Sequence, residues 1–183
     1  MGDTTKAMLP TFCRIFVGFD PDSTVVPADV DTAFGASWDE VGLLAKGGPT
    51  QNNTWGQNTK LYARNGELVR VYRDEYSTAF DFSVLELNET TDELVNPGSS
   101  PDKIYTPYPV PVMIAFEFQE LDVKRRLISA NYAEVMQNGA TTYAENGLIT
   151  YPLQAEIFPD PDDTNADGSP CLWIRQNTTD LSS

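Results

Sequence analysis

Residues 163–168 have the residue types of a calcium-binding loop. Asp163, Asn165 and Asp167 stand at positions one, three and five of such a loop, and a glycine follows at position six. Position twelve is Ile174, where a calcium loop has a bidentate Glu, and no helical pattern flanks the segment. Acids, amides and glycine between two strands are equally typical of a plain hairpin turn. We therefore expect an acidic loop with no metal and no cofactor, and keep calcium as the weaker interpretation.

The residue types needed for catalysis are sparse in this chain. The 183 residues include no His, which removes the commonest general base and every Ser-His or Cys-His arrangement. Pairs of acids are adjacent in the sequence at residues 39–40, 74–75 and 162–163, among others. Neighbours on a strand point to opposite faces, so such pairs do not converge across a cleft as a glycosidase requires. We expect a protein that is not an enzyme.

Charge and length limit the function classes further. Twelve Lys and Arg stand against 27 Asp and Glu, which gives a formal net charge of −15. This charge argues against a conventional nucleic-acid-binding protein, because phosphate contacts need a basic surface. Cys13 and Cys171 lack a metal-binding spacing, and no run of about 18 apolar residues suggests a membrane span. With 40% hydrophobic residues, we expect residues 1–183 to form a single folded domain.

The centre of the predicted fold is the segment 60–87. Asn65 and Gly66 predict a type I′ turn between two strands, and a second reversal is expected near residues 74–75. From residue 76 onward the side chains alternate between two faces. The face expected in the core consists of Tyr76, Thr78, Phe80, Phe82 and Val84. The opposite face is small and polar.

The rest of the chain supplies further strands and one helix. Strands are expected at residues 11–18, 38–44, 110–119, 125–136, 148–158 and 171–175. Thr90 and Glu93 have the spacing of a capping box and predict a short helix that ends before Pro97. Long loops are expected at residues 19–37, 46–58 and 160–170. The pattern predicts a mostly all-β protein, an antiparallel β-sandwich or barrel-like fold with one short flanking α-helix.

Several of these segments, taken in order, resemble the major tail (tail tube) proteins of long-tailed, siphovirus-type phages that infect actinobacteria. The first similar segment is Trp-Asp-Glu-Val-Gly-Leu-Leu at residues 38–44, which follows a strand and an acidic loop. The others are residues 67–90, which contain the alternating strand, and residues 126–134, 138–139 and 148–160. The resemblance extends from residue 11 to about residue 175.

The resemblance implies a structural virion protein with a tail-tube fold. Its copies would polymerise as stacked hexameric rings into a phage tail tube, through which DNA passes during genome ejection, and residues 46–58 would be a loop between rings. The implied partners are other copies of the chain, a tape measure protein, and tail terminator or baseplate proteins, with transient non-specific passage of dsDNA and no membrane. Assembly in the host cytoplasm would place the protein in the virion tail. The family has no catalytic residues.

Two sets of residues are candidates for these roles. The set expected to face the lumen is Ser77, Ala79, Asp81, Ser83 and Glu117. The set expected at contacts between subunits or rings, where bases would meet acidic loops, is Trp55, Arg64, Arg70, Arg73, Lys124, Arg125 and Arg126. For the polar strand face, ordinary exposure to solvent is the default interpretation.

A carbohydrate-binding β-sandwich is the alternative function. Its stacking platforms would be Trp38, Trp55 or Trp173, assisted by calcium in the loop at residues 163–168. Glycan binding that is lost on addition of a chelator would favour this alternative.

Overall fold

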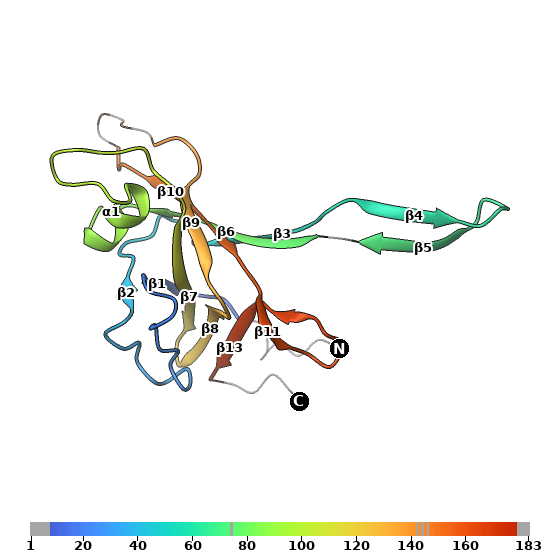
Figure 1. Cartoon of the computed structure of the whole chain (residues 1–183). Helices are drawn as coiled ribbons and strands as arrows, with labels where there is room; N and C mark the ends of the chain where they lie inside the picture. Colours follow the sequence, from blue (N-terminus) through green and yellow to red (C-terminus); the bar gives the residue numbers. More distant parts are fainter. Residues whose placement is uncertain (1–7, 74, 142, 144, 146, 179–183) are drawn as a thin grey trace.

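The chain folds into a β-sandwich from which one long hairpin projects (Figure 1). The computed structural model describes residues 8–178 except residues 74, 142, 144 and 146, and it describes only the backbone of Asn58, Tyr72 and Arg73. Sheet 1 consists of β2 (Asp39–Glu40), β1 (Phe12–Gly18), β7 (Val110–Glu120), β8 (Val123–Ser129) and β13 (Trp173–Asn177). Sheet 2 consists of β3 (Thr50–Trp55), β6 (Tyr76–Val84), β10 (Tyr151–Ile157) and β9 (Ala133–Gln137).

The two sheets are antiparallel and share strand β7. Residues 110–112 of β7 pair with β9 of sheet 2, whereas residues 113–119 pair with β1 of sheet 1. The described strands do not close into a barrel. The prediction of a mostly β, antiparallel sandwich with one short helix is therefore confirmed.

The core lies between the two sheets and follows from the alternation in each strand. Phe80 of β6 stacks on Phe116 of β7 with ring centroids 4.1 Å apart, which joins the two layers. Leu153 of β10 and Val135 of β9 complete the same cluster and are almost fully buried. The predicted inner face of β6 is confirmed from Thr78 to Val84, because each second residue there is buried. Tyr76, at the start of that series, is exposed.

The helix α1 (Glu89–Val95), the one helix among the described residues, closes one end of the sandwich. Its N-cap is Asn88 and not the predicted Thr90: the Asn88 side chain accepts a 2.8 Å hydrogen bond from the Thr91 backbone N–H. The buried Thr91 hydroxyl donates at 2.6 Å to the carbonyl of Val41, which ties the helix to the chain after β2. Asn and Thr are both favoured at the N-cap position. The hydrogen bond to Val41 holds Thr91 inside the first turn of the helix.

The loop at residues 19–37 covers the outer face of sheet 1. Phe34 stacks on Phe16 of β1 with centroids 4.1 Å apart, and the Trp38 indole N–H donates at 2.8 Å to the Val25 carbonyl. Trp38 and Val30 are buried. The prediction of a loop without helix or strand is confirmed at residues 19–37, but the loop is not simply solvated. The strand expected at residues 38–44 is reduced to the two residues of β2.

A continuous two-stranded ribbon replaces the predicted pair of reversals. β3 and β6 run on into β4 (Asn58–Tyr62) and β5 (Leu68–Arg73) with unchanged register, since Trp55 pairs with Tyr76 and Asn58 with Arg73. The Gly56 N–H donates to the Glu75 carbonyl at 3.0 Å across the junction. The reversal expected near residues 74–75 is therefore wrong, and the loop expected at residues 46–58 contains strand β3. We call residues 56–75 the arm.

The tip of the arm is not the predicted type I′ turn. Such a turn needs positive φ at two central residues, but of Asn65 and Gly66 only Gly66 has one, at 81°. The Ala63 carbonyl accepts from Gly66 N–H at 2.9 Å, and Ala63 N–H donates to the Glu67 carbonyl at 2.7 Å. Asn65 acts through its side chain, whose oxygen accepts from Glu67 N–H at 3.2 Å. Asn65-Gly66 thus marks the hairpin correctly but closes a three-residue loop.

Candidate functional surfaces

The outer face of sheet 2 is a mostly polar surface, with a hollow of about 240 Å³ beside Asp81 that Lys46 also lines. The register places the candidates Ser77, Ala79, Asp81 and Ser83 on one face with every second residue of β3, β9 and β10. We call this set the polar face: Thr50, Asn52, Thr54, Ser77, Ala79, Asp81, Ser83, Glu134, Met136, Pro152, Gln154 and Glu156. The four strands contain no Lys or Arg. Sequence reasoning missed the contributions of β3, β9 and β10, although in β10 the alternation of Pro152, Gln154 and Glu156 with buried residues carries the signal.

Asp81 lies at the centre of the polar face, between two amide side chains. Asn52 Nδ2 donates to one carboxylate oxygen at 2.5 Å, and Gln154 Nε2 donates to the other at 2.7 Å. The amides come from the strands on either side of β6, so the row of hydrogen bonds crosses three strands. The carboxylate is thereby held in a fixed position on a half-buried surface. A fixed negative group among hydroxyls, amides and acids would repel a polyanion.

Glu117 is not part of this face, and the prediction that it faces a lumen is wrong. It points from sheet 1 toward the loop at residues 19–37, is 3% exposed, and accepts from Arg126 Nε at 2.7 Å. A second ion pair, with Arg14, measures 3.4 Å. The alternation along β7 correctly turns Glu117 away from the main core. It could not show that a distant loop covers that side.

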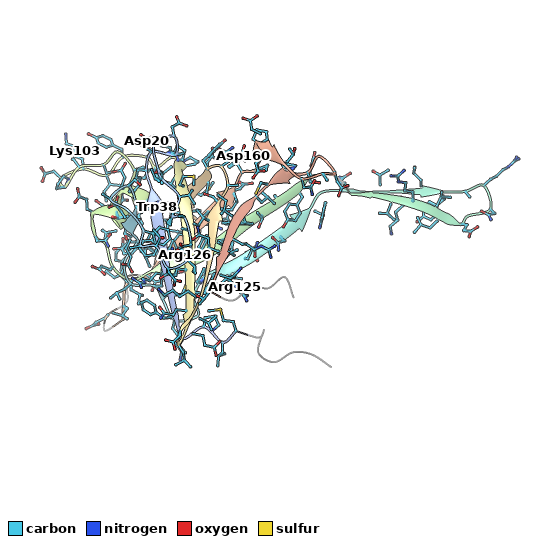
Figure 2. The ribbon with its side chains drawn as sticks, turned by 90° about the horizontal axis from the view of Figure 1, so that it is seen from below. Asp20, Trp38, Lys103, Arg125, Arg126 and Asp160 are labelled. Carbon is cyan, nitrogen blue, oxygen red and sulfur yellow. The ribbon has the colours of Figure 1, made fainter. Side chains whose placement is uncertain are left out.

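Arg126 is likewise buried, so its predicted place at a contact between subunits is wrong. One guanidinium nitrogen donates to the Asp29 and Thr32 carbonyls at 3.0 and 2.8 Å, and the group lies 4.4 Å from the Phe34 ring. Arg126 therefore fastens the covering loop to sheet 1 within the body of the molecule (Figure 2). A buried ion pair with full hydrogen bonding tolerates little change, since removing one partner leaves an uncompensated charge.

The other bases fall into two groups. Lys124 and Arg125 on β8 are half-buried, and Arg125 lines an opening of about 410 Å³ between the sheets together with Arg175. Arg64 lies in the turn at the tip of the arm, and Arg70 lies on β5. The side chain of Arg73 lies outside the described part of the chain.

The arm exposes large apolar side chains on both faces (Figure 2). By the register, Leu61 lies on one face, and Leu68 and Val71 lie on the other. Val69 is 67% exposed. At the base of the arm, Trp55 is about half exposed and packs against Tyr76, with ring centroids 4.9 Å apart. An apolar ribbon of this kind is typical of a surface that another molecule covers.

The arm also differs from the rest of the chain in charge. Residues 58–73 carry four Lys or Arg and one Glu, a net charge of +3. The other residues carry eight Lys or Arg and 26 Asp or Glu, a net charge of −18. Residues 58–73 are thus a basic stretch on an acidic chain, although Asp74 and Glu75 reduce the net charge of the whole arm to +1.

The features required by the carbohydrate alternative do not come together. Trp38 is buried under the loop at residues 19–37, and Trp173 packs edge-on against the core rings Phe80 and Phe116. Of the three tryptophans only Trp55 offers an exposed ring.

The candidate calcium segment is the turn of a hairpin between β11 (Asp160–Thr164) and β12 (Pro170–Cys171), where a loop was expected at residues 160–170. Asn165 Oδ1 accepts from the backbone N–H of Asp167 and Ser169 at 3.0 and 2.9 Å. Asp163 lies in the strand and not in the turn. In the described part of the chain, three or more His, Cys, Asp or Glu nowhere cluster as metal ligands would.

Both cysteines are free thiols, and the pKa of each is raised above its ordinary value. Burial, and after it the Glu117 carboxylate, raises the pKa of the Cys13 thiol to about 12. Burial, followed by the hydrogen bond and charge of Asp163, also raises the pKa of Cys171. A thiol that stays protonated is a poor nucleophile.

The sequence matches no known protein-family model, and a comparison with curated proteins gives no match either. Within the described residues, no helix is long and apolar enough to cross a membrane.

Proposed function

We propose that this chain is a self-assembling structural protein whose copies form a tube, with the polar face lining the bore. The specific form that the resemblance implies is a phage tail tube of stacked hexameric rings, through which DNA passes during genome ejection. The polar face and the arm would then have separate roles, one in passage and one in assembly.

The arm is the observation that carries this proposal. A two-stranded hairpin without a third strand or a packing partner is at best marginally stable in water. This one extends from the body with four large aliphatic side chains exposed on its two faces. The residues of the sandwich core all lie outside the arm, so its ordering contributes nothing to that core. Neighbouring copies are the simplest source of the missing contacts, because a repeating assembly covers every arm in the same way.

The polar face supports the role in DNA passage. Each phosphate contact with Lys or Arg adds affinity, and such contacts would slow DNA that moves through a bore. The strands of sheet 2 offer no such contact, since they contain no base. Asp81, Glu134 and Glu156 give the face a negative charge that neighbouring copies would repeat around the bore.

Negative-stain electron microscopy of the purified protein tests the proposal directly. We expect rings or tubes from the full chain. A variant in which residues 57–74 are replaced by a two-residue Asn-Gly turn should remain a folded monomer without tubes, because the register between Trp55 and Tyr76 is unaffected. Glu67→Gln, a conservative change at the tip, is the matched control and should form tubes. A full chain that stays monomeric at high concentration, or an armless variant that still forms tubes, would contradict the proposal.

A further inference from the structure

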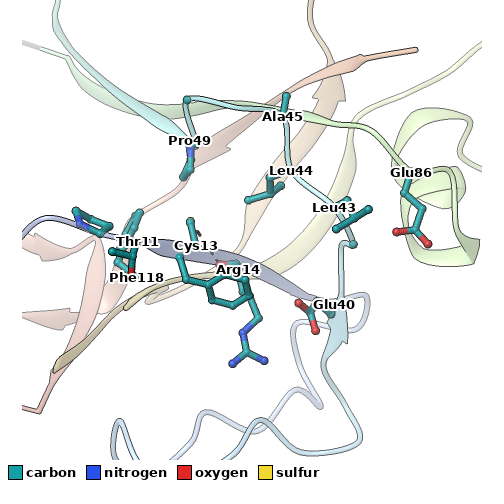
Figure 3. A pocket seen from close by; sticks show the side chains of 15 residues that line it. Thr11, Cys13, Arg14, Glu40, Leu43, Leu44, Ala45, Pro49, Glu86 and Phe118 are labelled. Atoms are coloured by element: carbon teal, nitrogen blue, oxygen red, sulfur yellow. Dashed lines mark hydrogen bonds between the residues drawn. The ribbon is translucent and has the colours of Figure 1, made fainter. Parts of the chain in front are cut away.

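A groove of about 660 Å³ opens between β1 and the segment at residues 42–49 (Figure 3). Its walls include Leu43, which is 65% exposed, and Phe12, which is 52% exposed. Glu40 and Glu86 stand at its rim. The groove is therefore apolar inside and acidic at one end.

The groove also contains an open strand edge. β2 pairs with β1 only at Phe16 and Val17, and the Val41 N–H adds a bond to the Ile15 carbonyl at 2.9 Å. Residues 12–14 pair with β7 on one side, but on the side of β2 they have no strand partner in the described structure. Cys13 has the same parity as Ile15, so its backbone N–H and carbonyl point toward this open edge. Such an edge is a template for an added strand.

We propose that the groove receives the arm of a second copy of this chain, and that one strand of that arm pairs with the open edge of β1. The inference rests on the proposed function in that it treats the arm as the assembly element. It goes further by naming the surface that receives the arm.

The shape of the arm fits this acceptor. Both outer edges of its two-stranded ribbon lack a strand partner among the described residues, as strand addition requires. Its apolar side chains on both faces, such as Leu61 and Val71, match an apolar groove. The ten residues from Gly56 to Asn65 reach about 30 Å at the rise of a β-strand. The arm extends away from β1 of its own chain, so it meets the groove of another molecule (Figure 1).

The charges of the arm and the groove are also complementary. Residues 58–73 carry a net charge of +3, and the acids Glu40 and Glu86 stand where a basic strand would enter. Arg14, the one base among the lining residues, forms an ion pair with Glu117 at 3.4 Å. Opposite charges on the two surfaces would fix the orientation of the arm and speed encounter. The association should therefore weaken as ionic strength rises.

The first test places a charge in the groove. Leu43→Arg puts a cation at an exposed position where the basic stretch of the arm would dock, and it should weaken self-association at least tenfold in sedimentation velocity. Ile104→Arg is the matched control, because Ile104 is 74% exposed and lies outside the groove. If Leu43→Arg associates as well as Ile104→Arg does, the groove is not the acceptor.

The second test mixes two variants that each lack one half of the contact. The armless variant retains the groove, and Leu43→Arg retains the arm. Each alone should remain monomeric, and an equimolar mixture should give a heterodimer on size-exclusion chromatography. Failure of the mixture to associate would overturn the inference. A second outcome would also overturn it: the armless variant associates with itself, and adding Leu43→Arg to that variant abolishes the association.

The outcomes separate this inference from the proposed function. A heterodimer without tubes from the full chain supports the contact between arm and groove and contradicts the tube. Tubes from Leu43→Arg as abundant as those from wild type support the tube and overturn the groove as its acceptor.

Discussion

The two outer faces of the sandwich have similar sequence patterns and opposite environments. On sheet 1, Glu117 and Arg126 alternate with core residues but are buried beneath the loop at residues 19–37. On sheet 2, Asp81 alternates with core residues in the same way, yet it stays half-buried at the surface, where it accepts hydrogen bonds from Asn52 and Gln154. A charged residue on the outer side of a strand thus holds a loop against the sheet in one case and remains a surface group in the other. The difference arises because the loop at residues 19–37 packs over Glu117 and Arg126, and it does not arise from the sequence of the strands themselves.

The largest effect is expected for Arg126→Met on the covered face. The change leaves Glu117 buried with only the partly exposed Arg14 and removes the hydrogen bonds to the Asp29 and Thr32 carbonyls. We expect a loss of about 3–5 kcal/mol in the free energy of unfolding, measured by urea denaturation in the armless background. The double variant Glu117→Leu with Arg126→Met should recover much of the loss, because no buried carboxylate then remains at this site, and Arg14, which also loses Glu117, is partly exposed. A loss from Arg126→Met of under about 1 kcal/mol would mean that the face is wetter than its burial indicates.

A smaller effect is expected from Trp38→Phe. Phe keeps an aromatic ring against Phe34 but lacks the indole N–H that donates to the Val25 carbonyl. The lost volume and hydrogen bond should cost about 1–3 kcal/mol, again measured by urea denaturation. Trp55→Phe is the control on an exposed ring and should change stability by less than about 0.5 kcal/mol. Equal losses at the two positions would remove the contrast between covered and exposed tryptophans.

On the polar face, Asp81→Lys should change function more than stability. As a surface substitution it should alter the free energy of unfolding by about 0.5–1 kcal/mol, through loss of the bonds from Asn52 and Gln154. If the polar face lines a bore, a phage carrying this change should assemble tails but deliver its genome slowly. Asp162→Lys, an exposed acid outside the polar face, is the matched control. Unchanged delivery by intact tails would place the polar face elsewhere than in the bore.

The smallest expected effect concerns pH and the loop that covers sheet 1. The hydrogen bond from the Thr32 side chain, then backbone bonds from residues 32 and 31 and the charge of Arg126, lower the pKa of Asp29. A carboxyl group whose pKa is lowered by folding stabilises the folded state at pH values above the ordinary Asp pKa of about 3.9. This contribution is lost as pH falls through the pKa of the group in the folded state. The stability difference between wild type and Asp29→Asn should therefore be small at neutral pH and disappear in acid. A difference that grows on acidification would contradict this assignment.

Several features follow from the sequence alone because their causes are local. The alternation from Thr78 to Val84 is sufficient to orient β6, since side chains on a strand change sides at every residue. Gly66 marks the tip of the hairpin because a turn there requires a residue that tolerates positive φ. The capping-box spacing of Thr90 and Glu93 places the start of α1 within two residues of its observed N-cap, Asn88.

Only the tertiary structure decided the features that depend on distant partners. β3 has no apolar alternation and becomes a strand because β6 supplies hydrogen-bonding partners for its backbone. The junction near Glu75 continues one ribbon and does not turn, since pairing on both sides keeps the same register. Arg126 and Asp81 each stand on the outer side of a strand, and a loop about a hundred residues away in sequence buries only Arg126. A strand's own residues determine which side chains share a face, but the contacts that cover that face come from elsewhere in the chain, where no local pattern records them.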